Sequence, residues 1–98
     1  MTTITDTIED LLTNLVKKIV DNPKDINIQV ACTTKSILVQ IKCNENDRGK
    51  IIGRQGRIID SLKIISTAVK NTQFLGDKKD IFIEILEEEK TVYKKDSK

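Results

Sequence analysis

The segment formed by residues 49–59 constrains the fold of this chain more than any other. Two isoleucines lead into a four-residue stretch, Gly53-Arg54-Gln55-Gly56, and a second apolar stretch with helical spacing follows it. Glycine adopts positive φ angles at little cost and allows another chain to lie close against the backbone. A loop of this kind at the start of a helix offers free N–H groups and the positive helix end to an anion. The pattern therefore predicts a loop that binds the phosphates of a phosphodiester backbone.

Basic side chains are concentrated around this stretch, which we call the glycine loop (residues 53–56). Residues 48–70 contain six basic side chains and one acidic side chain, a local charge of +5 in a chain whose net charge is +2. Concentrated positive charge attracts a polyanion and raises its association rate. Part of this set, Arg57, Lys63 and Lys70, fits the solvated face of an ordinary helix equally well.

The length of 98 residues suffices for one domain with a single core. No apolar run is long enough to span a membrane, and the N-terminus lacks the basic and apolar blocks of a secretory signal, so a cytoplasmic location is expected. Cys32 and Cys43 lie in alternating apolar runs and are expected to be buried thiols, with a disulfide between paired strands as the alternative. Because histidine and a close cysteine pair are lacking, no metal or other cofactor is expected.

The first half of the chain predicts a helix followed by a hairpin. Residues 6–21 carry apolar side chains at helical spacing, with Asp6 as the expected N-cap, Glu9 completing a capping box and Asn22-Pro23 as the stop. Residues 25–32 and 36–43 alternate apolar and polar side chains, which is typical of half-buried strands. The short connection between them predicts an antiparallel hairpin.

The second half predicts two helices, a loop and a last strand. A short helix over residues 45–52, capped by Asn44, ends at Gly53, and a longer helix runs from the glycine loop to about Asn71. A loop over residues 71–80 follows, in which Phe74 and Leu75 are expected to cover the edge of the core, and a strand occupies residues 81–86. The expected apolar stripe of the longer helix consists of Ile58, Leu62, Ile65 and Val69.

The element order α-β-β-α-α-β indicates an α+β protein. A crossover of two helices allows the second and third strands to lie parallel, which predicts a three-stranded mixed sheet with the helices packed on one face. A single domain is expected over residues 1–87. The charged residues 88–98 are expected to form a flexible C-terminal tail.

The segment Ile51-Ile52-Gly53-Arg54-Gln55-Gly56-Arg57-Ile58 resembles the signature of the KH domain, an RNA-binding module whose G-x-x-G loop clamps about four nucleotides. The element order is similar to the bacterial, type II arrangement of that fold. Asp21-Asn22-Pro23 and Gly49-Lys50 are similar to the small bacterial single-KH-domain RNA-binding proteins of the KhpA type. The resemblance covers residues 8–87, and the long 71–80 loop and the charged tail depart from it.

This resemblance implies a type II KH-like fold and cytoplasmic binding of single-stranded RNA, as a post-transcriptional regulator or RNA chaperone. It also implies a homodimer, or a heteromer with a larger KhpB-type protein that joins a KH domain to a second nucleic-acid-binding domain. Proteins of this pair are linked to the control of cell division, cell elongation and cell shape. The alternative is a KH-fold protein-interaction or dimerisation module without direct RNA contact, against which the cationic Arg54 argues.

Eight residues form the predicted RNA site. Arg54 and Gln55, at the loop tip, are expected to meet phosphate and sugar oxygens, while the two glycines allow RNA to approach the backbone. Lys50 and Arg57 supply nearby charge. The complete set is Lys50, Ile51, Ile52, Gly53, Arg54, Gln55, Gly56 and Arg57.

Apolar residues beside the loop have two interpretations. Some of Ile51, Ile52 and Ile58 are candidates for the floor of a groove that holds bases, although Ile51, Ile58 and Leu62 fit the core as well. Further base contacts are expected from the neighbouring strand, through Gln40 or Lys42. Ile64 lies away from the centre of the stripe and is either a dimer contact or the edge of a wide buried face.

Other functional classes lack their motifs. The phosphate loop G-x-x-x-x-G-K-[ST] and the dinucleotide motif G-x-G-x-x-G are absent, and no nucleophile–base pair is evident, so an enzyme is not expected. An RNA-recognition motif stacks bases on sheet aromatics, and this chain has only Phe74, Phe82 and Tyr93. Binding of single-stranded DNA stays open, because the loop does not itself read the 2′-hydroxyl group.

Overall fold

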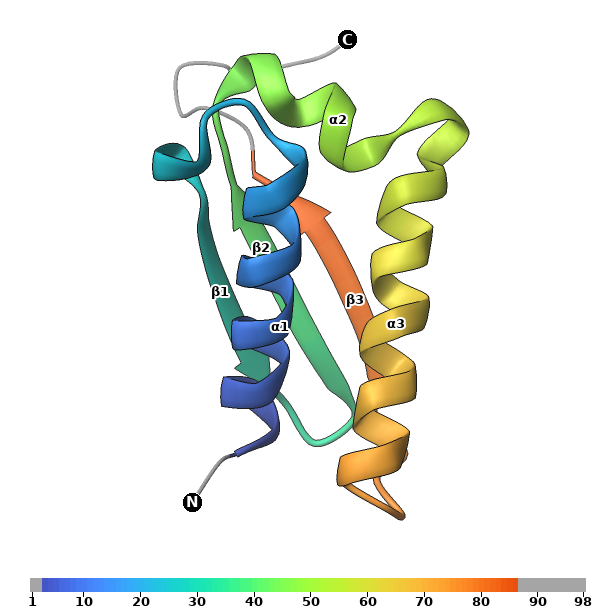
Figure 1. Cartoon of the computed structure of the whole chain (residues 1–98). Coiled ribbons are helices and arrows are strands. Elements are labelled where there is room, and N and C mark those ends of the chain that lie inside the picture. The colour runs from blue at the N-terminus through green and yellow to red at the C-terminus, as the bar shows by residue number, and fades with distance from the viewer. Residues whose placement is uncertain (1–2, 87–98) are drawn as a thin grey trace, which may run out of the picture.

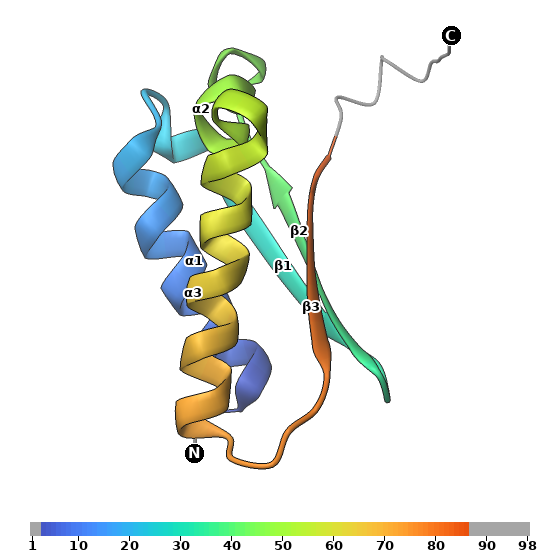
Figure 2. The same ribbon diagram turned by 90° about the vertical axis from the view of Figure 1, so that its right-hand side faces the viewer.

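Three α-helices pack on one face of a three-stranded sheet, as a computed structural model that describes residues 3–86 shows (Figures 1 and 2). The predicted order, the α+β class and the mixed sheet are confirmed. The charged tail lies outside the described residues. The elements are α1 (Ile4–Ile19), β1 (Asn27–Cys32), β2 (Ser36–Lys42), α2 (Arg48–Ile52), α3 (Arg57–Gln73) and β3 (Asp80–Ile85), with short 3-10 turns η1 (Pro23–Asp25), η2 (Glu45–Asp47) and η3 (Arg54–Gly56).

The sheet has the order β1-β2-β3. The central strand β2 is antiparallel to β1 and parallel to β3. A tight turn joins β1 to β2, in which the Ser36 N–H donates to Thr33 Oγ1 at 2.9 Å and the Thr33 N–H donates to the Ser36 carbonyl at 2.8 Å. The chain then crosses through α2 and α3 before it returns as β3 beside β2. Both predicted strand pairings are therefore confirmed.

The core lies between the sheet and the helices. Alternate residues of β2 face it, and residues four apart on α1 cover it, because strands alternate their side chains and helices repeat every 3.6 residues. Each fully buried aliphatic side chain contributes about 1.5–3 kcal/mol to folding. The buried apolar residues are Ile8, Leu12, Val16, Ile26, Ile28, Ile37, Val39, Ile41, Cys43, Ile51, Leu62 and Ile81.

The N-terminal cap of α1 differs from the prediction. Thr3, in an extended conformation, accepts a hydrogen bond from the Asp6 N–H on its Oγ1 at 3.1 Å, so the helix begins at Ile4. Thr3 and Asp6 can both cap a helix, and the structure uses the earlier residue. Asp6 instead lies in the first turn, where its negative charge suits the helix dipole.

The apolar stripe predicted for α3 is only partly correct. Its fully covered side chains are Leu62, Ser66 and Lys70, whereas Ile58 and Ile65 are 38% and 42% exposed. The buried face is therefore rotated toward two polar residues. Ser66 is small enough to lie where the helix packs closely, and Lys70 tolerates burial because its ammonium group has partners.

Those partners organise the connection between α3 and β3. Lys70 Nζ donates to the Asp77 carbonyl at 3.0 Å, and the Asp77 carboxylate accepts from the Lys79 N–H at 2.8 Å and pairs with Lys79 Nζ at 3.0 Å. Because α3 extends to Gln73, the loop is shorter than predicted. Of the two residues expected to cover the core edge, Phe74 is half-buried, whereas Leu75 is 85% exposed, so the prediction is wrong for Leu75.

The two cysteines have different environments. Cys43 is buried as predicted, but Cys32 is exposed. Burial decreases along β1 from Ile28 through Val30 to Cys32, because the strand runs out from beneath the helical layer toward the hairpin turn. Both thiols are free, so they form no disulfide.

Candidate nucleic-acid interface

The glycine loop forms a single 3-10 turn between α2 and α3, at one corner of the molecule (Figure 1). The Gly56 N–H donates to the Gly53 carbonyl at 3.2 Å, and the Arg57 N–H donates to the Arg54 carbonyl. Arg54 and Gln55 are exposed at the tip. The first amides of α3 come directly after this turn, and a helix leaves its first N–H groups without intrahelical acceptors. The corner therefore presents N–H groups and the positive end of a 17-residue helix.

The two glycines are needed for different reasons. Gly53 has φ 77° and ψ 172°, and a Cβ atom there would lie 2.3 Å from Ile58 Cγ1 and 2.8 Å from the Ile58 nitrogen. Gly56 has the left-handed values φ 75° and ψ 15°, but a Cβ would meet nothing closer than 4.0 Å. Gln55 between them is also left-handed, with φ 58° and ψ 26°, which is uncommon for a residue with a side chain. The sharp reversal thus depends on three residues with positive φ.

Three cationic side chains surround the turn. Lys50, Arg54 and Arg57 are all exposed, and the predicted placement of charge beside the loop holds for them. Lys50 Nζ lies 3.4 Å from Asp21 Oδ2 in an exposed ion pair, and Arg57 Nη2 lies 3.5 Å from Gln55 Oε1. Exposed pairs of this kind are weak, so these cations are free to exchange partners with an incoming anion.

Lys63 and Lys70 of the sequence cluster are placed away from the loop, whereas Arg48 is the half-buried first residue of α2. Lys70 is only 3% exposed and binds Asp77 at the far end of α3, about 20 Å along the helix from Arg57. Lys63 lies over the ring of Phe82 on β3, with its Nζ 5.5 Å from the ring centroid. The local charge of +5 therefore does not form one surface, and the loop itself has three nearby cations.

The isoleucines beside the loop separate into two groups. Ile51 is fully buried, so its side chain belongs to the core and is not available to a ligand. Ile52 is half-buried and Ile58 is 38% exposed, so both border the loop with apolar surface. Leu62, considered for the core or the groove, is buried.

The expected base contacts from β2 are not supported by the geometry. Since Ile37, Val39 and Ile41 face the helices, Gln40 and Lys42 lie on the opposite face of the sheet. Gln40 Nε2 donates to Glu84 Oε2 of β3 at 2.8 Å on that face. The edge strand β3, and not the central β2, runs beside α3 (Figure 1).

Asp47 is a residue that the sequence analysis did not single out for the site. It is fully buried, and its carboxylate accepts hydrogen bonds from the N–H groups of Asp21 at 3.2 Å and Asn22 at 3.0 Å and from Asn22 Nδ2 at 3.1 Å. Burial alone would raise the pKa of this carboxyl group, but the three hydrogen bonds and the nearby Lys50 lower the pKa below its usual value. The run Asp21-Asn22-Pro23 is the sequence feature that could have pointed to this contact, because it contains the hydrogen-bond partners of Asp47.

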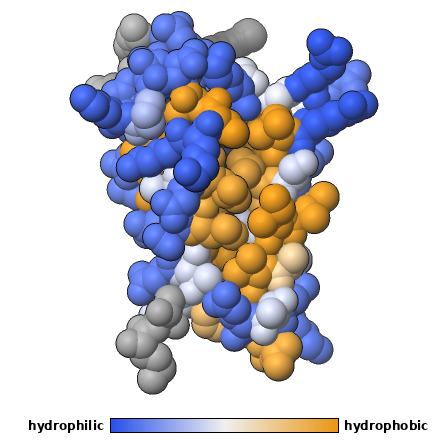
Figure 3. Space-filling view, viewed as in Figure 1, coloured by the Kyte–Doolittle hydropathy of each residue, from blue (hydrophilic) through white to orange (hydrophobic). Residues whose placement is uncertain are grey.

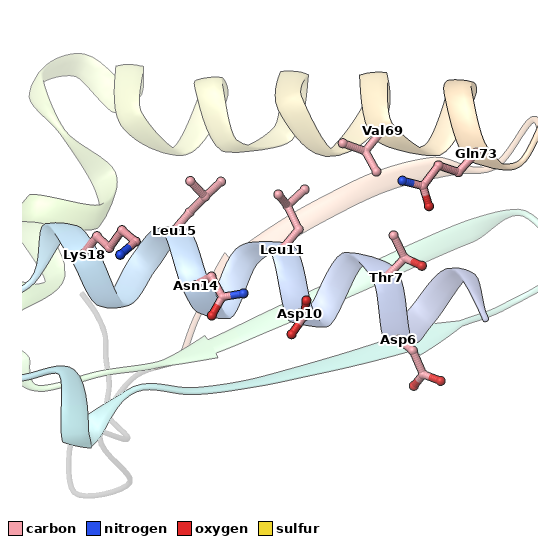
Figure 4. A pocket seen from close by; sticks show the side chains of 9 residues that line it. All are labelled: Asp6, Thr7, Asp10, Leu11, Asn14, Leu15, Lys18, Val69 and Gln73. Carbon is pink, nitrogen blue, oxygen red and sulfur yellow. The ribbon is translucent and has the colours of Figure 1, made fainter. Parts of the chain in front are cut away.

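A groove of about 590 Å³ lies between α1 and α3. Figure 4 shows Leu11 and Leu15 of α1 and Val69 of α3 pointing into the space between the two helices, and Figure 3 shows apolar surface along the middle of this side of the molecule. Its charged lining residues are Asp6, Asp10 and Lys18, so carboxylates outnumber cations along its rim. Carboxylates repel phosphates, so the groove is a poor place for a polyanion, in contrast to the glycine loop.

Comparison with known families assigns the chain to one of them. A family model described as the KH domain of KhpA/KhpB matches residues 9–85, which include the glycine loop and almost every described element. The chain belongs to the KhpA/KhpB KH-domain family. Its fold, with the element order α-β-β-α-α-β, is therefore that of a KH domain.

Several relatives resemble this KH domain along nearly their whole length. RNA-binding protein KhpA of Clostridium perfringens is 35% identical over 78 residues, which are 80% of this chain and 99% of the relative. The protein of the same name from Listeria monocytogenes is 35% identical over 79 residues, 81% of this chain and 99% of the relative. That of Caldanaerobacter subterraneus is 31% identical over 77 residues, 79% of this chain and 97% of the relative.

A solved structure shares the fold at low sequence identity. The crystal structure of Aquifex aeolicus Era bound to GDP and AlF4− superposes with a TM-score of 0.64 and 11% identity, covering 88% of this chain and 33% of that protein. This likeness concerns the fold alone. Among residues 3–86, no helix has the length and apolar character needed to cross a membrane.

Proposed function

We propose that this KH domain binds single-stranded RNA at the glycine loop. The observation that carries the proposal is the exposed reversal at residues 53–56, with Lys50, Arg54 and Arg57 around it and the N-terminus of α3 behind it. Helix N-termini and guanidinium groups both favour phosphate. Membership of the KhpA/KhpB family, and relatives named RNA-binding protein KhpA, support RNA as the polyanion.

The phosphates would lie against the turn. Gly53 and Gly56 lack side chains, so the sugar–phosphate chain approaches the backbone, while Arg54 and Gln55 reach its oxygens from the tip. The bases would then turn toward the apolar border formed by Ile52 and Ile58. Stacking and apolar contact of this kind tolerate many sequences.

The site is open and small, so one domain should bind weakly. We infer that the protein acts in the cytoplasm with a second RNA-binding surface, from another copy or from a larger KhpB-type partner, because linked sites raise avidity through effective concentration. Exposed apolar side chains on α3, above all Ile64 at 68% exposure, support contact with another chain. Its role would be that of a post-transcriptional regulator or RNA chaperone in cell division and cell shape control, and not that of an enzyme.

The experiment that tests RNA binding reverses charge at the loop tip. Arg54→Asp/Gln55→Asp should weaken binding to a labelled single-stranded RNA by at least about tenfold to a hundredfold, because the loss of even one hydrogen bond to a charged group costs about 1.5–3 kcal/mol and repulsive charge is added. Fluorescence anisotropy measures the affinity, and circular dichroism checks the fold. The affinity for single-stranded DNA of the same sequence tests whether the protein discriminates ribose from deoxyribose.

The matched control is Thr34→Asp/Lys35→Asp in the β1–β2 turn. It changes one basic and one neutral residue, both exposed, to the same two acids at the opposite end of the molecule (Figure 1). This control should retain most of the affinity. Equal affinities of the two folded variants would instead remove the glycine loop from the RNA site, and no measurable RNA binding by the wild type would favour a protein-interaction module.

A further inference from the structure

The carboxylate of Asp47 joins two segments that are distant in sequence. It accepts from the Asp21 and Asn22 N–H groups and from the Asn22 side chain, at 3.2, 3.0 and 3.1 Å, in the turn that follows α1. This carboxylate thus satisfies two backbone N–H groups in the turn that follows α1. Removing the acceptor would leave partly buried N–H groups without a partner, which is costly.

This contact lies directly before α2, the short helix that leads into the glycine loop. Asp47 is the last residue of η2 and the N-cap of α2, and the five residues of α2 lead to Gly53. A helix of one turn is not stable alone, so tertiary contacts must fix its direction. Contacts that help to do so among residues 3–86 include the Asp47 hydrogen bonds, the buried Ile51 side chain and the Lys50–Asp21 ion pair.

Among these contacts, that of Asp47 is both buried and directional. Ile51 burial is non-directional, and the Lys50–Asp21 pair is exposed and weak. The Asp47 hydrogen bonds are charge-assisted, and their geometry defines how α2 is oriented relative to α1. The direction of α2 in turn sets where Gly53 begins the reversal and where Arg54 points.

We propose that Asp47 is a positioning residue for RNA binding, which holds α2 and the glycine loop in the orientation that phosphate contact requires. It is fully buried, so it does not touch the ligand. The inference rests on the proposed binding of RNA at the loop and adds the residue that maintains its geometry.

The direction in which Asp47→Asn changes the RNA affinity distinguishes a positioning role from a purely electrostatic one. Asp47→Asn removes a negative charge close to the loop, and charge alone would then make RNA bind more tightly. Loss of positioning makes RNA bind more weakly. Glu45→Gln is the matched control, because Glu45 is exposed on the same 3-10 turn and its change alters the net charge by the same amount.

The experiment measures single-stranded RNA affinity for the wild type, Asp47→Asn, Glu45→Gln and Asn22→Ala, at a temperature where circular dichroism shows each folded. Asp47→Asn should bind about tenfold or more weakly, and Glu45→Gln equally or slightly more tightly. Asn22→Ala keeps the charge and the buried acceptor but removes its side-chain donor, and should bind a few-fold more weakly. If Asp47→Asn binds like Glu45→Gln, or if it does not fold and Asn22→Ala binds like the wild type, the proposal is overturned.

A second measurement distinguishes positioning from general loss of structure. Asp47→Asn is combined with Arg54→Asp/Gln55→Asp, and its effect on affinity should nearly disappear there, because the loop no longer contributes. An equal effect in both backgrounds would overturn the positioning role. If Arg54→Asp/Gln55→Asp itself leaves the affinity unchanged, the proposed function fails, whatever Asp47→Asn does.

Discussion

At the residue scale, the glycine loop shows that two glycines of one motif meet different constraints. Gly53 leaves room for Ile58 and holds a backbone conformation that side chains exclude, whereas Gly56 needs only a left-handed conformation. Gly49, in α2, has no positive φ, and a Cβ there would have open space. The motif therefore contains one glycine fixed by both packing and backbone conformation and one fixed by backbone conformation alone.

Substituting these glycines by alanine should give graded effects. Gly53→Ala should lose about 1–3 kcal/mol or more through strain and lose RNA affinity. Gly56→Ala should lose about 1–2 kcal/mol, and Gly49→Ala should gain up to about 1 kcal/mol through helix propensity. Urea unfolding and RNA anisotropy on the three variants measure both quantities. A Gly53→Ala protein as stable as Gly49→Ala would contradict the described turn.

The Asp47 carboxyl group should make stability depend on pH. Because its pKa is lowered in the folded state below the ordinary 3.8, its stabilising contribution is complete above that value and is lost as the pH falls through the folded pKa. The melting temperature of the wild type should therefore exceed that of Asp47→Asn at neutral pH, and the difference should shrink below about pH 4. Comparison with this variant removes the contribution of Asp77, whose pKa is lowered by hydrogen bonds from Lys79 and by the Lys79 and Lys70 charges. A difference that stays constant with pH would show that the carboxylate charge does not contribute.

At the element scale, α1 is defined by its cap and by its buried face. Ile8, Leu12 and Val16 are four residues apart and all lie in the core, which fixes the rotation of the helix. Its beginning is fixed by the Thr3 hydroxyl and not by the Asp6 carboxylate. Substitutions can distinguish the two residues, because the Thr3 hydroxyl acts through a hydrogen bond and the Asp6 carboxylate through its charge at the end of the helix dipole.

Thr3→Ala should cost about 1 kcal/mol, the usual value of an N-cap, and lower the melting temperature by about 4–8 °C. Asp6→Ala should cost less, about 0.3–1 kcal/mol, because only its interaction with the helix dipole is lost. Thermal unfolding followed by circular dichroism compares the two. If Asp6→Ala proved the more damaging change, the carboxylate and not the hydroxyl would be the cap.

At the scale of the whole molecule, charge and shape differ from one face of the surface to another. The cations at the glycine loop occupy one corner, the Lys70–Asp77–Lys79 cluster closes the other end of α3, and the acidic rim of the α1–α3 groove lies on a different face. Polyanion binding is therefore expected at one corner of the domain and over a small area. Few phosphates can be contacted there at once.

The salt dependence of RNA binding should reflect that small area. If the corner neutralises about 2–3 phosphates of a single strand, the slope of log K against log salt should be about −1.4 to −2.1. Titrations of RNA at several potassium chloride concentrations measure this slope. A slope near zero would mean that phosphate contact does not drive binding, and a much steeper one would require cations beyond the loop.

The element order, the hairpin, the glycine loop and the family could be predicted from the sequence alone, because these depend on local periodicity, turn chemistry and a short motif. The same reasoning predicts a site at residues 50–57. Which side chains share a surface could be read only from the folded chain: Ile51 and Lys70 are buried, Gln40 and Lys42 face away from the helices, and Cys32 is exposed. Asp47 belongs to the same class, since its partners lie 25 and 26 residues earlier in the chain. Periodicity reports neighbours along the chain, whereas burial and long-range hydrogen bonds depend on how the elements pack.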